Sequence, residues 1–266
     1  MQPELKSAPG AVDRDKSNGT RSYEGSELEL FSRATNWKAY WSSFVAPYIR
    51  GRVLDVGAGI GSTAELFRNV VCDRWIALEP DPGMSEHIGD LVRSGRLPKR
   101  VEARCGTTQQ LDPGERFDAI LYVDVLEHIE DDTGELERAA RHLAPGGSLV
   151  VLAPAHNSLY TPFDRAIGHY RRYDRKMLAS INPESVNLVA MRYFDSVGML
   201  ASLGNRFLLR SAYPTVAQIA FWDSVLVPIS RMVDPLLLGR VGKTIVGVFK
   251  ARDEAVADDA RQSRAT

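Results

Sequence analysis

The sequence is poor in cysteine and has no excess of charge of either sign. Its 266 residues include 2 cysteines, Cys72 and Cys105, and neither stands in a CxxC or CxxH spacing. So few cysteines, without such a spacing, exclude a disulfide-stapled miniprotein and a cysteine zinc site. They favour two buried thiols in a reducing cytoplasm. Lys plus Arg number 33 and Asp plus Glu 34, for a net charge of -1. A chain without a basic surplus is not expected to bind nucleic acid.

Long apolar runs are also scarce. The longest in the first two hundred residues, 149–153, is far shorter than the ~18 residues that span a bilayer. Residues 1–20 lack the apolar core of a secretory signal. We therefore expect a cytoplasmic protein with no transmembrane segment. The composition still allows peripheral contact with a membrane. The polar stretches 1–22 and 253–266 are predicted to be a disordered arm and tail around one domain, 23–252.

Short β-rich runs alternate with helical stretches along this domain. Such alternation is typical of an α/β fold with a mostly parallel sheet and helical crossovers. The predicted strands are 52–56, 75–78, 100–104, 119–123, 148–153, 187–194 and 244–249. The predicted helices are 61–67, 84–94, 133–142 and 175–181, after an aromatic-rich helical lead-in at 27–50 that we expect to face the core.

The stretch 198–242 differs from the rest. It is rich in large apolar residues, contains Pro214, Pro228 and Pro235, and is too long for a simple loop. We predict a helical insertion, divided by its prolines, between the sixth and seventh strands. Its apolar surface predicts packing on the sheet, a dimer contact, or a wall for a hydrophobic acceptor. We expect Phe221 and Trp222 to line that acceptor pocket, in a monomer or a homodimer.

A glycine loop is the strongest local signal. The first strand leads through Asp55 into Gly57, Ala58, Gly59 and Gly61, after which a helix is predicted. Glycine lets the backbone approach a ligand closely and adopt positive φ. The start of the helix adds unpaired N–H groups.

An acid ends the second predicted strand. Glu79 stands 18 residues beyond Gly61, where a carboxylate can accept hydrogen bonds from both ribose hydroxyls of an adenosine cofactor. A dinucleotide loop needs Gly or Ala at the position of Ser62. S-adenosylmethionine therefore fits the loop better than NAD does.

Together these motifs resemble those of class I S-adenosylmethionine-dependent methyltransferases. The matching segments are the Asp55-to-Gly61 loop, Glu79, Phe117-Asp118-Ala119-Ile120, Asp124 to Ile129, and Leu143-Ala144-Pro145-Gly146-Gly147. The resemblance implies a Rossmann-like, doubly wound sheet of seven strands whose last strand is antiparallel and lies beside the sixth. It implies that Gly57, Ala58, Gly59 and Gly61 hold the cofactor with Asp55 beneath them and Glu79 on the ribose.

The family's adenine-binding acid is missing. The segment after the third strand reads Cys105-Gly106-Thr107-Thr108-Gln109-Gln110. Thr108 or Gln109 is the candidate for this contact.

Candidate catalytic groups follow the fourth strand. Asp124, Glu127 and His128 lie where ligands bind in open α/β sheets, and we place Asp124 along the cofactor. His128 could take a proton near neutral pH. The triplet resembles one that holds a divalent ion in ubiquinone-pathway and small-RNA methyltransferases, and also a purely structural Glu-His pair in other relatives. We favour a metal-independent site.

A further segment follows the fifth strand. Gly168-His169-Tyr170-Arg171-Arg172-Tyr173 resembles a bacterial subgroup, similar to methyltransferase types 11 and 12, of mostly unassigned substrate. His169 is the candidate site residue here. Arg171 and Arg172 could bind an anionic acceptor, or could pair with acids such as Asp164 while Asp174 caps the next helix.

The sequence thus predicts an S-adenosylmethionine-dependent methyltransferase. We expect a small-molecule acceptor, methylated on a hydroxyl oxygen, from a glycan, lipid-linked or natural-product pathway. The alternatives are a protein methyltransferase and a non-catalytic protein that binds S-adenosylmethionine.

Overall fold

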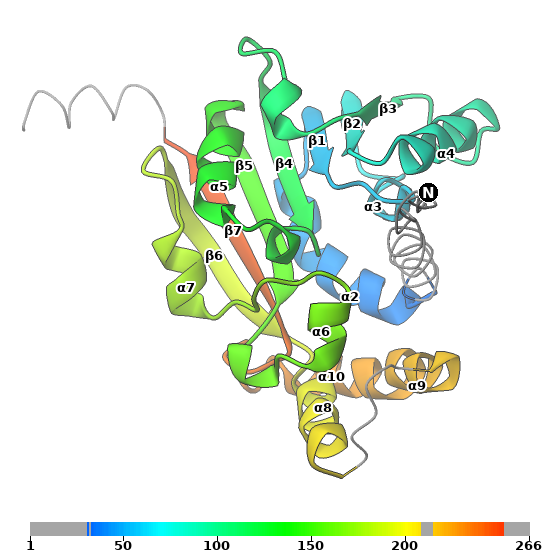
Figure 1. Cartoon of the computed structure of the whole chain (residues 1–266), viewed down its shortest axis with the longest axis vertical. Helices are drawn as coiled ribbons and strands as arrows, with labels where there is room; N and C mark the ends of the chain where they lie inside the picture. Colours follow the sequence, from blue (N-terminus) through cyan, green and yellow to red (C-terminus); the bar gives the residue numbers. More distant parts are fainter. Residues whose placement is uncertain (1–30, 32, 209–214, 253–266) are drawn as a thin grey trace, which may run out of the picture.

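The computed structural model describes residues 31, 33–208 and 215–252 of the chain (Figure 1). The predicted arm 1–22 and tail 253–266 lie outside the described residues, as does the start of the predicted domain at residue 23. The boundaries 23–252 therefore stay a prediction.

A seven-stranded sheet forms the centre, in the order β3-β2-β1-β4-β5-β7-β6. Its strands are β1 (Arg52–Val56), β2 (Arg74–Glu79), β3 (Val101–Cys105), β4 (Phe117–Val123), β5 (Leu143–Pro154), β6 (Val186–Phe194) and β7 (Thr244–Ala251). Neighbouring strands from β3 to β5 are parallel. β7 is antiparallel to both β5 and β6, with Val246 opposite Leu152 on one side and Arg192 on the other. The predicted Rossmann-like α/β fold and the antiparallel last strand are confirmed.

Helices cover both faces of the sheet. They are α2 (Thr35–Val45), α3 (Ser62–Leu66), α4 (Pro82–Arg93), α5 (Asp132–Arg141), α6 (Pro162–Ala166), α7 (Arg175–Ser180), α8 (Ser196–Leu208), α9 (Val216–Phe221) and α10 (Val227–Val233). One core packs α2, α3, α4 and the insertion against side chains such as Trp75 and Leu152. The other packs α5 and α7 against side chains such as Ile120 and Val151. Side chains alternate across each strand, so one strand supplies both cores.

Two expectations about single residues meet different outcomes. The lead-in is helical at α2, and its Trp37, Tyr40 and Trp41 are buried as expected. The expectation of two buried thiols is wrong for Cys105, which is exposed, while Cys72 is partly buried. Both are free thiols.

The insertion between β6 and β7 is helical, as predicted. Pro235 follows the end of α10 as expected and Pro214 lies outside the described residues, but Pro228 does not divide the helical run. α9, a short π-helical turn (Trp222–Leu226) and α10 follow one another without a break. Pro228 stands in the first turn of α10, where its missing N–H is tolerated because a wide turn precedes it. The 18-residue stretch Val216–Val233 is long and apolar enough to cross a membrane by length and composition. Length and composition alone do not establish a transmembrane segment, so the expectation of none stays a prediction.

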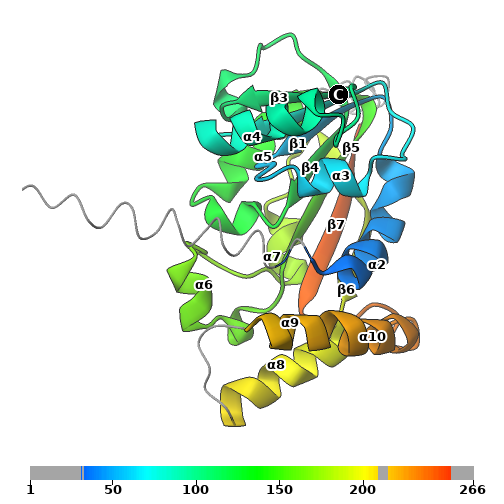
Figure 2. The same cartoon turned by 90° about the vertical axis from the view of Figure 1, so that its right-hand side faces the viewer.

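Buried acids attach the insertion to the body. Asp223 accepts hydrogen bonds from the backbone N–H groups of Asn36 and Trp37, at 3.2 and 2.8 Å, at the start of α2. Asp234 accepts one from Tyr40 Oη at 2.8 Å and one from the Asp195 N–H at 2.7 Å. Burial and Asp234 raise the pKa of Tyr40, so it remains a hydrogen-bond donor. Figure 2 shows α8, α9 and α10 together at one end of the molecule.

Candidate active site

Three residues other than glycine adopt positive φ within two residues of the end of a strand. They are Asp124 (φ 53) after β4, His156 (φ 65) after β5 and Asp195 (φ 65) after β6. Such conformations cost about 1–3 kcal/mol each and occur preferentially at functional sites. All three lie at the carboxyl edge of the sheet, where open α/β folds bind ligands. This edge is therefore the candidate site.

The glycine loop lies at the same edge. The Gly57 and Ala58 N–H groups donate to Leu78 O at 2.8 and 3.1 Å, which holds the loop against the end of β2. Gly57 has φ +65, and a Cβ there would lie 2.7 Å from Val125 Cγ2. Gly59 has φ 55, and Gly61 at φ 83 precedes the first residue of α3. The loop thus needs glycine for its shape and for its contact with the segment after β4.

Glu79 is buried and directed at the loop. Its Oε2 accepts from the Gly59 N–H at 2.8 Å, and its Oε1 accepts from the Asp81 N–H at 2.9 Å. Burial raises the pKa of Glu79, and the two backbone hydrogen bonds oppose that rise. Each carboxylate oxygen has two lone pairs, so both retain capacity for a further donor.

Asp55 lies beneath the loop, where the sequence placed it. It is 1% exposed, and Trp75 Nε1 donates to its Oδ2 at 3.3 Å. Burial raises the pKa of Asp55 to about 7 against the effect of the Trp75 hydrogen bond. Asp55 therefore supports the loop from below.

Thr108 does not match its predicted role. Its side chain is buried, and its hydroxyl lies 2.8 Å from Glu135 Oε1 on α5. The hydroxyl is thereby committed to Glu135, which argues against a side-chain contact with adenine. The sequence indicates only that Thr108 follows β3. The direction of its side chain is set by the hydrogen bond to Glu135 on α5.

The acid and histidines after β4 and β5 form one cluster. Ligand atoms of Glu127, His128 and His169 all lie within 4.8 Å of one another. The rings of His128 and His169 meet edge to face at 4.6 Å between centroids. The sequence separates these residues by some forty positions, and the fold brings them together.

Glu127 is the unusual member of this cluster. It is 0% exposed, and neither carboxylate oxygen has a hydrogen-bond partner. Burial, with the nearby Asp124, raises the pKa of Glu127 well above its ordinary value. An unpaired buried carboxylate is costly. The site therefore favours a proton on Glu127 or a cation beside it.

The two histidines differ in their surroundings. His128 is exposed at the carboxyl edge of the sheet, yet desolvation by the surrounding protein, together with the nearby His169, lowers its pKa to about 4. His128 is therefore neutral at neutral pH. His169 is partly buried, and its Nδ1 lies 3.0 Å from Asp164 Oδ1. Asp164 thus orients the His169 ring.

The arginines near His169 pair with acids. Arg172 binds Asp164 through Nε at 2.8 Å and Nη2 at 2.9 Å, and Arg171 lies 2.6 Å from Asp132. Burial raises the pKa of the Asp164 carboxyl, but hydrogen bonds from His169 and Arg172 outweigh this effect and hold it well below its ordinary value. The ion-pair alternative is therefore the one observed. Asp174 caps α7, as that alternative also required.

Sequence reasoning missed Lys243 and Asp195. Lys243 Nζ lies 3.3 Å from Asp195 Oδ2 and 3.9 Å from the centroid of the Trp222 ring. Burial lowers the pKa of Lys243, while Asp195 opposes that effect and Asp124 adds to the opposition. No local pattern joins residues 48 positions apart.

Phe221 and Trp222 do not form the expected pair of pocket aromatics. Phe221 is exposed on the outside of the insertion, and Trp222 is buried against Phe31 and Trp37 of the lead-in. Trp222 contacts the site through its indole N–H, which donates to Asp195 Oδ2 at 2.6 Å, and through its ring, which lies under Lys243.

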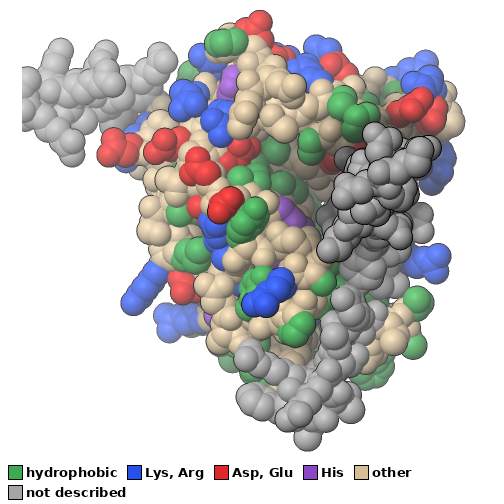
Figure 3. All heavy atoms as spheres, in the orientation of Figure 1, with side chains coloured by type: hydrophobic (Ala, Val, Ile, Leu, Met, Phe, Trp, Pro, Cys, Tyr) green, Lys and Arg blue, Asp and Glu red, His purple; other side chains and the backbone are tan. Residues whose placement is uncertain are grey.

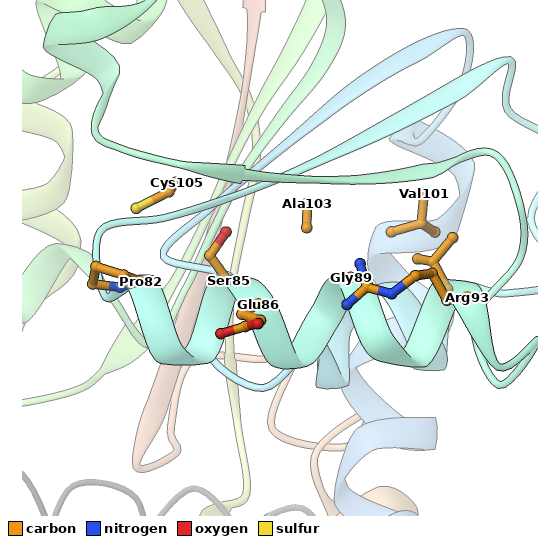
Figure 4. A pocket seen from close by; sticks show the side chains of 9 residues that line it. Pro82, Ser85, Glu86, Gly89, Arg93, Val101, Ala103 and Cys105 are labelled. Carbon is orange, nitrogen blue, oxygen red and sulfur yellow. The ribbon is translucent and has the colours of Figure 1, made fainter.

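A separate hollow lies between α4 and the edge strand β3 (Figure 4). Its lining includes Ser85, Glu86 and Arg93 of α4 with Ala103 and Cys105 of β3. None of the residues predicted to bind the cofactor or to act in catalysis lines it. We therefore place the reaction at the carboxyl edge of the sheet.

The sequence of the chain is similar to that of known methyltransferases. A family model described as a methyltransferase domain matches residues 30–190, which is more than half of the chain. The ubiquinone biosynthesis O-methyltransferase of Bradyrhizobium sp. (strain ORS 278) is 34% identical over 100 residues, and these cover 38% of this chain and 38% of that relative. The chain thus aligns with well under half the length of this curated relative.

Solved structures show the same fold. An S-adenosylmethionine-dependent methyltransferase from Clostridium acetobutylicum aligns with a TM-score of 0.55 and 12% identity, over 90% of this chain and 100% of that one. Coclaurine N-methyltransferase, bound to N-methylheliamine and S-adenosylhomocysteine, aligns with a TM-score of 0.53 and 17% identity, over 85% and 72%. The chain belongs to the methyltransferase domain family, in the class I group whose methyl donor is S-adenosylmethionine.

Proposed function

We propose that the protein transfers a methyl group from S-adenosylmethionine to a hydroxyl oxygen of a small-molecule acceptor in the cytoplasm. One observation supports this most directly: Val125, which stands in the Asp124-to-His128 segment, packs against Gly57 in the donor loop. The donor loop and the candidate catalytic segment are therefore in contact. The name of the Bradyrhizobium relative, an O-methyltransferase, favours oxygen as the methylated atom.

The methyl donor is proposed to bind to the glycine loop and to one carboxylate. Gly57, Ala58, Gly59 and Gly61 would form the floor beneath the cofactor, and Glu79 would accept hydrogen bonds from the ribose hydroxyls. Asp124, exposed at positive φ after β4, would lie along the cofactor. Methyl transfer is an in-line displacement, so positioning alone can supply much of the rate.

The acceptor side is proposed to work through His128. The imidazole is neutral and has a lone pair for the hydroxyl proton as the oxygen attacks the methyl group. Its lowered pKa makes it a weaker base than free imidazole, so positioning of the acceptor supplies most of the rate. His169, oriented by Asp164, and the buried Glu127 would position the ring of His128. The proton then passes from His128 to solvent, since His128 is exposed.

The same three residues fit a divalent cation. Glu127 offers two carboxylate oxygens without partners, and the two histidines offer imidazole nitrogens. Asp124 of the predicted triplet is not part of this cluster, and one carboxylate with two imidazoles suits Mn²⁺, Fe²⁺ or Zn²⁺ better than Mg²⁺, which prefers oxygen ligands. A bound cation would supply a Lewis acid for the acceptor oxygen. The metal-independent site favoured by the sequence is thus one of two arrangements that the cluster permits.

A turnover assay separates these arrangements. Release of S-adenosylhomocysteine would be followed with a panel of sugars, phenols and lipid-linked intermediates, before and after a chelator. If His128 is the base, activity survives the chelator and falls at least about a hundredfold in His128→Ala, the usual range for general-base loss. Activity lost to the chelator and restored by Mg²⁺ or Mn²⁺ would contradict metal independence. No release with any acceptor, alongside normal cofactor binding, would favour the non-catalytic alternative.

A further inference from the structure

The insertion exposes a row of large apolar side chains. Phe221 is 55% exposed, Ile229 43%, Met232 77% and Leu236 81%. Val225 is 39% exposed, and the spacing of four, four and three residues from Phe221 to Met232 is close to the helical repeat, which favours one side of the helical run. Leu236 lies in the turn directly after α10. We call these five residues the apolar face. Leu200, Leu237 and Leu238 are exposed on the same insertion.

The opposite side of this run is also apolar and is already covered. Ile219, Trp222 and Val227 are buried against the body of the protein. Over Val216–Val233 the mean hydropathy is 1.2, yet only 28% of the stretch is buried. A helix that is apolar all round is normally covered on all sides. The apolar face therefore needs a partner that this chain does not supply among its described residues.

The charges around the apolar face have one sign. Among the described side chains of the insertion, at 196–204 and 215–242, the two acids Asp223 and Asp234 are buried and bonded to the body. The two arginines, Arg231 and Arg240, are exposed. In Figure 3 hydrophobic side chains show at the lower right, near α9, and no acidic side chain is visible among them. The exposed surface of the insertion is thus apolar and basic.

We propose that the apolar face docks on the surface of an anionic lipid bilayer. The apolar side chains would enter the boundary between headgroups and acyl chains, while Arg231 and Arg240 would bind lipid phosphates. The place of the insertion at one end of the molecule leaves the sheet clear of the membrane (Figure 2). Docking of this kind needs neither the cofactor nor methyl transfer, so it stands apart from the proposed function.

Two other arrangements fit less well. A spanning helix would have to break the bonds of Asp223 and Asp234 to the body and carry both acids into hydrocarbon, which is costly. If a second copy of this chain packed its own apolar face on this one, arginines of like charge would come together, and the described side chains of the insertion offer no exposed acid to pair with them.

Vesicle sedimentation with the full chain tests the proposal. Vesicles of phosphatidylcholine mixed with phosphatidylglycerol would be compared with vesicles of phosphatidylcholine alone. We expect the protein to sediment with the anionic vesicles and to be released by salt, because basic contacts to anionic lipid are screened. The double variant Met232→Glu with Leu236→Glu should bind the anionic vesicles at least about tenfold more weakly. The double variant Arg231→Ser with Arg240→Ser should lose much of the preference for anionic lipid.

The matched control is Val71→Glu. Val71 is 91% exposed but lies far along the chain from the insertion, between α3 and β2, so this variant should bind vesicles normally. All substituted side chains are exposed, and thermal melts would verify folding. Absent binding of the natural sequence, or equal binding by Met232→Glu with Leu236→Glu, would overturn the proposal. A dimer that this variant converts to monomer would overturn it as well and assign the face to a second copy.

Discussion

At the scale of single residues, the site depends on acids held away from water. Asp55, Glu79 and Glu127 are all buried, and each has a raised pKa because of that burial. Asp55 and Glu79 have backbone or indole donors, whereas Glu127 has none. A buried acid without compensation lowers stability whenever it is ionised. We infer that these acids lower the stability of the fold and are retained for their role in the candidate site.

Asp55 provides a test of this cost. Its pKa rises from 3.8 in the unfolded chain to about 7 in the folded protein. Between these values the folded state holds the proton and the unfolded state does not, so the stability contribution falls as pH rises from about 4 to about 7. Asp55→Asn keeps the acceptor for Trp75 and removes the ionisation.

Urea unfolding of both proteins at about pH 4 and about pH 8 would measure this effect. We expect Asp55→Asn to gain free energy of unfolding relative to the natural sequence at the higher pH and to gain much less at the lower one. A difference between the two proteins that does not change with pH would show that Asp55 is not the titrating group.

At the scale of elements, the insertion is the distinctive part of the fold. Tertiary contacts hold it to α2 and to the end of β6, through the carboxylates of Asp223 and Asp234. Its helices would be marginal on their own, since isolated short helices are weak in water. The anchoring acids should therefore matter more for stability than acids of the same type at the surface.

The variant Asp234→Ala tests this anchor. It removes the acceptor of the Tyr40 hydroxyl and of the Asp195 and Ser196 N–H groups, all of which are buried. We expect the free energy of unfolding to fall by about 3 kcal/mol, the range for losing charged hydrogen bonds and leaving buried donors unpaired.

Denaturant titration would measure this loss, with Glu184→Ala as the matched control. Glu184 is exposed on the turn before β6, so its removal should change stability by about 0.5 kcal/mol or less. Equal losses in the two variants would mean that Asp234 does not anchor the insertion.

Local patterns predicted most elements. β1 was located from Arg52 to Val56 because an apolar run ends there at a glycine loop, and β7 was placed beside β6 through the resemblance to methyltransferases. The unbroken passage of the insertion through Pro228 was not predicted, because a proline reads as a helix end and only the preceding π-helical turn shows otherwise. The ion pair of Lys243 with Asp195 was missed because tertiary packing alone joins those residues. The direction of the Thr108 side chain was not predicted, because Glu135 on a different element sets it.

At the scale of the whole molecule, we propose that one edge of the sheet binds both the methyl donor and the acceptor. The glycine loop and Glu79 lie after β1 and β2, and Glu127, His128 and His169 lie after β4 and β5. Parallel strands end together at this edge, so motifs far apart in the sequence become neighbours. The insertion, anchored at the end of β6, adds the apolar face that we propose to meet a membrane.

Calorimetric titration with S-adenosylhomocysteine tests the central claim most directly. We expect one site in the natural sequence and, in Glu79→Ala, binding weaker by roughly ten- to a hundredfold, since a charged hydrogen-bond partner is worth about 1.5–3 kcal/mol. Glu86→Ala, which alters an exposed acid on α4, should bind normally. Absent binding in the natural sequence, or unchanged binding in Glu79→Ala, would contradict the assignment of this edge as the cofactor site.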